Sequence, residues 1–180
     1  MSIFSECRAV VLLADYAVAD SGGKLNILGA GFTITAVQPT TGLTAAQYVV
    51  VMVDVPPRYV GEDFPLGVEL RDEATGQTVV MPGPTGNPDA LRVQQLVRAE
   101  PPQIAGVYLP TSLWSRVQLV LAFPNGLPLQ PGGEYHWRVE VEAQHRQGWS
   151  AHFLVAGPPP PPVFGGPAGN QDIQDVPPVE

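Results

Sequence analysis

The stretch that decides the fold class is Leu129-Gln-Pro-Gly-Gly-Glu-Tyr135, followed directly by His136-Trp-Arg-Val-Glu-Val-Glu142. Its Pro-Gly pair predicts a turn that delivers Tyr135 to the start of a strand, and the strand then alternates its side chains between two faces. Greek-key sandwiches use this device as a tyrosine corner, in which the ring packs at the strand start and the hydroxyl bonds to upstream backbone. The stretch therefore predicts architecture and no chemistry.

The rest of the chain, read outward from this stretch, is a series of short apolar runs separated by turn residues about every ten positions. Nine segments are strand candidates: Arg8–Ala19, Lys24–Thr35, Gln47–Val55, Leu66–Arg71, Gln77–Met81, Asp89–Glu100, Ser115–Phe123, Glu134–Glu142 and Trp149–Ala156. Together they predict an all-β fold, an antiparallel, immunoglobulin-like Greek-key β-sandwich, over residues 1–156. The most hydrophobic of them, Gln47–Val55, is expected to be a central strand buried on both faces.

One segment is ambiguous. Asn87-Pro88-Asp89 is a possible helix start, with proline at the first helical position. Residues 91–97, however, alternate apolar and polar side chains with the period of a strand, so we favour a strand for Asp89–Glu100 and keep the helix as the alternative. Gln103–Leu113 is expected to be an extended crossing segment of the kind that Greek keys contain.

From residue 157 the composition changes. Residues 157–180 contain five consecutive prolines and three acidic residues but no basic residue, which predicts an extended polyproline arm or linker that does not join the sandwich. The residues expected to contact a partner are Trp114, in the crossing segment, and six residues of the arm, Pro158, Pro159, Pro160, Pro161, Pro162 and Phe164.

Charge and cysteine content exclude several classes of function. The net charge is −8, which disfavours binding to nucleic acids and to anionic membranes. The single cysteine, Cys7, permits no intrachain disulfide and is expected to be a plain buried thiol. The N-terminus lacks the charged region and cleavage site of a signal peptide, so we expect synthesis in the cytoplasm without secretion.

Several segments resemble a known family. Ala14-Asp-Tyr-Ala17 with Gly23-Lys-Leu-Asn-Ile-Leu-Gly-Ala-Gly31, Val68-Glu-Leu-Arg-Asp72, the Tyr135 stretch and Phe153-Leu-Val155 are similar to an uncharacterised bacterial and phage family that is abundant in actinobacteria. That family is known only as a domain of unknown function. The resemblance implies a β-sandwich over about residues 8–156 and implies no activity, cofactor or catalytic residue. The doubled glycine before Glu134 and the long tail depart from the family's pattern.

Two groups of residues are candidate metal sites. His136 and His152 would face one another if their strands were neighbours, and Glu134 or Glu140 would then complete a set suited to zinc or iron. The acidic loops at Asp20, Glu62-Asp63 and Asp72-Glu73 offer oxygen ligands of the kind calcium takes. Neither group has a recognisable ligand spacing, so we predict no metal, no cofactor and no catalytic residue.

The expected function is therefore non-catalytic. The chain is predicted to be a structural or interaction protein that forms a homo-oligomer or larger assembly through its sandwich and its proline-rich arm. A virion accessory protein, such as a capsid decoration protein of an actinobacterial phage, would fit the arm, the acidity and the lack of disulfides. The alternative is a cytosolic bacterial module that binds a soluble partner or ligand through its loops.

Overall fold

The structure is a computed structural model, and it describes residues 2–20, 23–83, 86–101, 103 and 106–157. Within these ranges the chain forms two short 3₁₀ helices and twelve strands. In chain order they are η1 (Ile3–Ser5), β1 (Arg8–Ala14), β2 (Tyr16–Ala19), β3 (Leu25–Leu28), β4 (Ile34–Ala36), β5 (Gln47–Val55), η2 (Pro57–Tyr59), β6 (Asp63–Asp72), β7 (Val80–Pro82), β8 (Pro88–Ala90), β9 (Arg92–Arg98), β10 (Ser115–Phe123), β11 (Glu134–Val141) and β12 (Ser150–Ala156).

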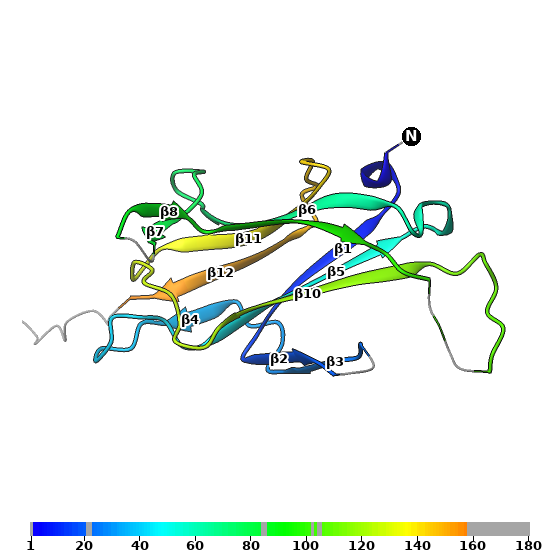
Figure 1. The fold of residues 1–180 in the computed structure, drawn as a ribbon. Helices are drawn as coiled ribbons and strands as arrows, with labels where there is room; N and C mark the ends of the chain where they lie inside the picture. The colour runs from blue at the N-terminus through cyan, green and yellow to red at the C-terminus, as the bar shows by residue number, and fades with distance from the viewer. Residues whose placement is uncertain (1, 21–22, 84–85, 102, 104–105, 158–180) are drawn as a thin grey trace, which may run out of the picture.

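Two sheets form the layers of a sandwich (Figure 1). One has three strands in the order β1-β5-β10, and the other has five in the order β4-β12-β11-β6-β9. The strand pairs are antiparallel apart from β4 and β12, which run parallel. Two further hairpins, β2-β3 and β7-β8, stand beside the sheets. The predicted all-β sandwich is confirmed, with one parallel pair that the sequence did not indicate.

The tyrosine corner forms at the start of β11, as the sequence predicts. The Tyr135 side chain is buried at 4% exposure, and its hydroxyl accepts a hydrogen bond from the backbone N–H of Gln130 at 3.2 Å. The two glycines before Glu134 have different structural roles. Gly132 adopts φ +82°, whereas a Cβ on Gly133 would lie 2.7 Å from the Tyr135 ring. One glycine therefore makes the turn, and the other leaves room for the ring.

The expected first strand, Arg8–Ala19, is divided at Asp15. β1 belongs to the three-stranded sheet and β2 pairs with β3 in a separate hairpin. Gly29 lies against this break with φ +62°, so close that a Cβ there would overlap the Asp15 carboxylate. The second expected strand is interrupted at the same glycine pair, because β3 ends before Gly29 and β4 begins after it. The predicted bend in that strand is thus a change from one sheet to another.

Strand β5 occupies the centre of the three-stranded sheet, between β1 and β10. Its odd-numbered valines, 49 to 55, point into the core and are fully buried, and Val50 on the other face is buried too. Tyr48, Met52 and Asp54 share that other face and are only partly buried. The prediction of burial on both faces is therefore wrong for the outward face, which the described residues leave partly open to solvent.

The ambiguous segment Asp89–Glu100 is extended, as β8 and β9, and the helical alternative is wrong. β9 pairs antiparallel with β6 along its whole length, which satisfies the alternating pattern that the sequence shows. β6 begins at Asp63, earlier than expected, because it pairs with β9 from there onward. The chain then passes from β9 in the five-stranded sheet to β10 in the three-stranded sheet, which is the crossing expected of a Greek key.

Aromatic side chains fill both ends of the core. Trp137 stacks on Phe123 with ring centroids 5.3 Å apart, and Trp149 meets the edge of Phe4 at 5.4 Å. Cys7 is fully buried, and burial raises the pKa of its thiol to about 11. At neutral pH the thiol is therefore protonated and inert, in agreement with the sequence-based expectation.

Candidate functional site

The outward face of the β1-β5-β10 sheet is apolar over most of its length. The register places three residues in each cross-strand row: Arg8, Asp54 and Arg116, then Val10, Met52 and Gln118, then Leu12, Val50 and Val120, then Ala14, Tyr48 and Ala122. We call these residues the outer face. A solvated sheet face normally alternates to polar side chains. Here the middle rows are almost entirely hydrophobic, but Val50 and Ala14 are fully buried, because β2 packs against β5 and β10 on this side. The exposed apolar part of the outer face is therefore the row of Val10, next to its charged end.

Trp114 lies at the charged end of the outer face, immediately before β10. Its side chain is 44% exposed, and the Arg8 guanidinium sits over its ring at 5.2 Å from the centroid. Arg116 binds Asp54 through two contacts of 2.6 and 3.1 Å. These four side chains line a hollow of about 470 Å³ that opens to solvent. The structure thus leaves the predicted contact residue accessible beside two arginines.

Further large apolar side chains are exposed in the same crossing segment. Val107, Tyr108 and Leu113 protrude, and the Tyr108 ring is 89% exposed. Against this segment lies a second hollow of about 280 Å³, lined mainly by prolines and apolar side chains, among them Pro57, Val60 and Pro101. Trp, Tyr and Arg are the residues that most often contribute binding energy at protein interfaces. Their concentration here favours a binding role for this end of the sandwich.

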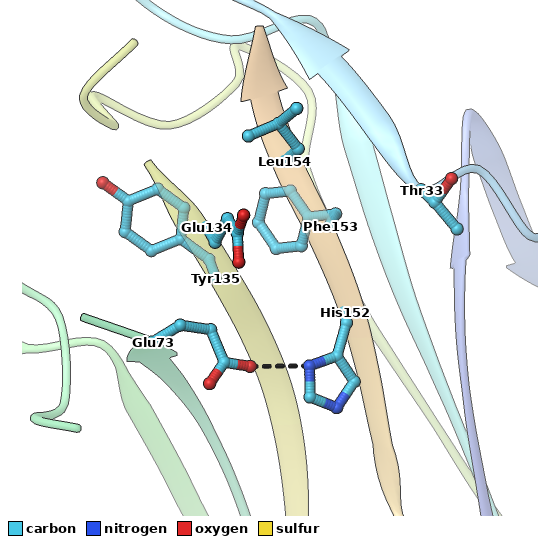
Figure 2. Close-up of a pocket in the computed structure, with 7 residues that line it drawn as sticks. All are labelled: Thr33, Glu73, Glu134, Tyr135, His152, Phe153 and Leu154. Atoms are coloured by element: carbon cyan, nitrogen blue, oxygen red, sulfur yellow. Dashed lines mark hydrogen bonds and ion pairs between the residues drawn. The ribbon is translucent and has the colours of Figure 1, made fainter. Parts of the chain in front are cut away.

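The five-stranded sheet brings the two candidate histidines together on its outer side. His136 on β11 and His152 on β12 are direct register partners, with ring centroids 5.0 Å apart. The third member of the cluster is Glu73, in the turn after β6. Its Oε1 lies 2.8 Å from His136 Nδ1 and 2.6 Å from His152 Nδ1 (Figure 2 shows the second contact). Among the residues that the structure describes, this is the one group of three potential metal ligands whose ligand atoms converge.

Neither carboxylate proposed from the sequence occupies the third position. Glu140 points into an ion-pair network, and Glu134 lines the hollow beside His152. In the sequence Glu73 is part of an acidic loop, and nothing in its sequence position indicates that the turn after β6 meets β11 and β12. Burial lowers the pKa of His136 from its ordinary value, against the opposing effect of the Glu73 carboxylate.

The turn that carries Glu73 is held firmly. Asp72 Oδ1 accepts hydrogen bonds from the backbone N–H of Thr75 at 2.8 Å and from its hydroxyl at 3.1 Å. The Glu73 N–H donates to the Glu134 carbonyl at 3.0 Å, which ties the turn to the first residue of β11. The carboxylate is thereby delivered next to both imidazoles from a turn that is itself hydrogen-bonded to their sheet.

Beside the histidine cluster the same sheet face carries a network of buried charges. Glu69, 3% exposed, accepts from Arg138 Nε at 2.6 Å and from the Thr78 hydroxyl at 3.0 Å. Glu140 accepts from Arg138 at 2.5 Å and from Arg92 at 2.6 Å. Each carboxylate thus has at least two donors. Such saturation suits a structural role better than acid–base catalysis, which needs a group free to exchange protons with a substrate.

The remaining residues expected to make contacts, Pro158 to Pro162 and Phe164, lie outside the described residues. Their role stays a prediction, as does the expected location in the cytoplasm. Among the described residues no helix has the length and hydrophobicity needed to cross a membrane.

Comparison with models of known protein families assigns the chain to a family. The model of the family of unknown function DUF6941 matches residues 9–153. The chain belongs to this family. The match runs from β1 to β12 and thus includes strands of both sheets, the outer face apart from Arg8, and the histidine cluster. The suspected membership of a domain of unknown function is confirmed. A comparison with curated proteins found no match for this DUF6941 protein.

Proposed function

We propose that this protein is a non-catalytic interaction module. Its binding surface is the outer face together with Trp114, and its partner is the proline-rich arm of a second copy of the chain. The observation that carries the proposal is the apolar outer face, which ends at Trp114 and two arginines. Burying the exposed Val10 and the partly exposed Met52 against a partner would remove apolar area from water, at roughly 25 cal/mol for each Å².

The arm has the chemistry that this surface would recognise. Consecutive prolines are already extended, so they lose little conformational entropy on docking, and they bind grooves lined by aromatic rings. Trp114 and Tyr108 provide such rings, and both are exposed. The arm carries three acidic residues and no basic one. Arg8, Arg116 and Asp54 line the hollow at Trp114, and because Asp54 pairs with Arg116, these side chains leave one net positive charge there. The aromatic rings and the net charge therefore favour the same pairing.

The mass of the full chain in solution, measured by light scattering, tests this proposal. We expect a defined oligomer for the full chain and monomers for a chain ending at Ala156, which retains every described strand. Trp114→Ala in the full chain should also dissociate the oligomer. Leu96→Ala removes an apolar side chain that is more exposed than Trp114 from β9 in the other sheet, and should leave the mass unchanged.

A monomeric full chain would refute assembly through the arm and direct attention to an outside partner. An oligomer that survives both the truncation and Trp114→Ala would refute the assigned surface. A place in a virion stays a prediction of the sequence.

A further inference from the structure

We propose that His136, His152 and Glu73 form a binding site for a divalent transition-metal ion, and that Zn²⁺ is the ion that best fits the ligand set. The site lies on the opposite sheet from the outer face, so it is independent of the proposed interaction. Two imidazole nitrogens and one carboxylate oxygen are a recurrent protein ligand set for zinc with an open coordination position.

The backbone fixes both imidazoles. His136 and His152 are opposite one another in an antiparallel ladder, and their neighbours Tyr135 and Phe153 point into the core with ring centroids 5.8 Å apart. Because side chains alternate along a strand, both histidines must project outward from the same spot. No loop movement is needed to bring them together.

The ligand atoms converge on one point. Both Nδ1 atoms face the same oxygen, Glu73 Oε1, and the three ligand atoms all lie within 4.8 Å of one another. Tetrahedral zinc with bonds of about 2.0–2.1 Å needs ligand atoms about 3.3 Å apart. The present contacts of 2.6 and 2.8 Å are shorter, whereas the two Nδ1 atoms lie within 4.8 Å of one another. A metal ion would therefore enter after the carboxylate withdraws by about half an ångström and the imidazole rings turn until their Nδ1 atoms also reach the tetrahedral spacing. A Glu side chain at a partly exposed turn can make that shift by small rotations.

The chemistry of the ligands selects the class of ion. Calcium and magnesium prefer six or more oxygen ligands, and this site offers a single carboxylate. Imidazole nitrogen suits zinc, copper, nickel and iron. Three protein ligands leave at least one coordination position open. Glu73 and His152 border a hollow of about 240 Å³, which is also lined by Thr33, Glu134 and Phe153 (Figure 2). A water molecule or an anionic group would complete the coordination there.

Calorimetric titration of the untagged, chelator-treated full chain with zinc chloride tests the site. We expect one ion per chain, and a rise in Tm of about 5–10 °C at a hundredfold excess over Kd. His136→Gln, His152→Gln and Glu73→Gln should each weaken binding by at least about tenfold. His145→Gln is the matched control, since His145 bonds the Val139 carbonyl away from the cluster, and it should bind zinc as the unaltered chain does.

Co²⁺ provides a second readout that does not depend on stability. In the unaltered chain Co²⁺ should give the intense visible absorption of a four-coordinate site, and in His152→Gln this absorption should be absent. His152 is chosen because its side chain is exposed, so that replacing it disturbs folding least. The proposal is overturned if zinc binds substoichiometrically, if the three variants bind it as tightly as the control, or if calcium raises Tm equally.

Discussion

Substituting the two glycines before Glu134 separately should have unequal costs. Gly132 has φ +82° and open space around its Cα, so Gly132→Ala costs only the left-handed backbone, about 1 kcal/mol. Gly133 is different, because a Cβ there would lie 2.7 Å from Tyr135 Cε2 and 2.7 Å from its hydroxyl oxygen. Displacing the buried ring costs about 1–3 kcal/mol as overpacking, and losing the Gln130 hydrogen bond adds about 1 kcal/mol.

Urea unfolding followed by tryptophan fluorescence measures the difference. With a slope of about 2 kcal/mol per molar urea, Gly132→Ala should lower the midpoint by about 0.5 M and Gly133→Ala by about 1–2 M. Tyr135→Phe, which removes only the hydroxyl that accepts from Gln130, should cost about 1 kcal/mol.

A double-mutant cycle decides whether the ring is the cause. In a Tyr135→Leu background the aromatic atoms nearest the new methyl group are gone, so Gly133→Ala should cost less than half of its value in the unaltered chain. Equal costs for the two glycine substitutions, or an unchanged cost of Gly133→Ala without the ring, would refute the reasoning that one glycine serves conformation and the other serves space.

Two further predictions concern the five-stranded sheet and its hairpin, and both can be read from urea midpoints. Arg138→Met should destabilise the fold by about 3 kcal/mol, because it leaves the buried Glu69 and Glu140 carboxylates without their shared donor. Arg98→Met is the control, since it breaks an exposed pair with Asp63, and it should leave the urea midpoint unchanged. Equal effects of the two substitutions would contradict a structural role for the buried network. Ala143→Gly should instead stabilise the protein by about 0.5–1 kcal/mol, because Ala143 holds φ +58° in the turn after β11, and a lower midpoint would show that the strain is absent.

Local sequence signals predicted the individual strands of the fold better than they predicted which strands pair with one another. The Tyr135 corner could be recognised because its turn, its ring and the backbone N–H that donates to its hydroxyl all lie within residues 130–135. The strand at β9 followed from alternation alone. The division of Arg8–Ala19 at Asp15 was missed, because it depends on Gly29 approaching from another strand, and no pattern within residues 8–19 reports that contact.

The candidate sites show the same division. Trp114 could be singled out because it stands beside the crossing segment, yet its partnership with Arg8 depends on how β1 and β10 flank β5. The two histidines were noted from their strands, but Glu73 was not linked to them. It lies 63 residues from His136 and 79 from His152 in the chain, and only the β6-β11-β12 order brings it within hydrogen-bond distance of both.

The sequence alone thus determined the all-β class, the strand alternation, the tyrosine corner, the buried thiol and the family resemblance, because turn chemistry and period-two patterning act between residues close in the chain. The tertiary structure decided the sheet order, the parallel β4-β12 pair, the apolar outer face and the Glu73–His136–His152 cluster. The physical reason is that strand pairing depends on competition among all the strands for partners and for burial. The residues of a single segment therefore do not specify which strand will lie beside it.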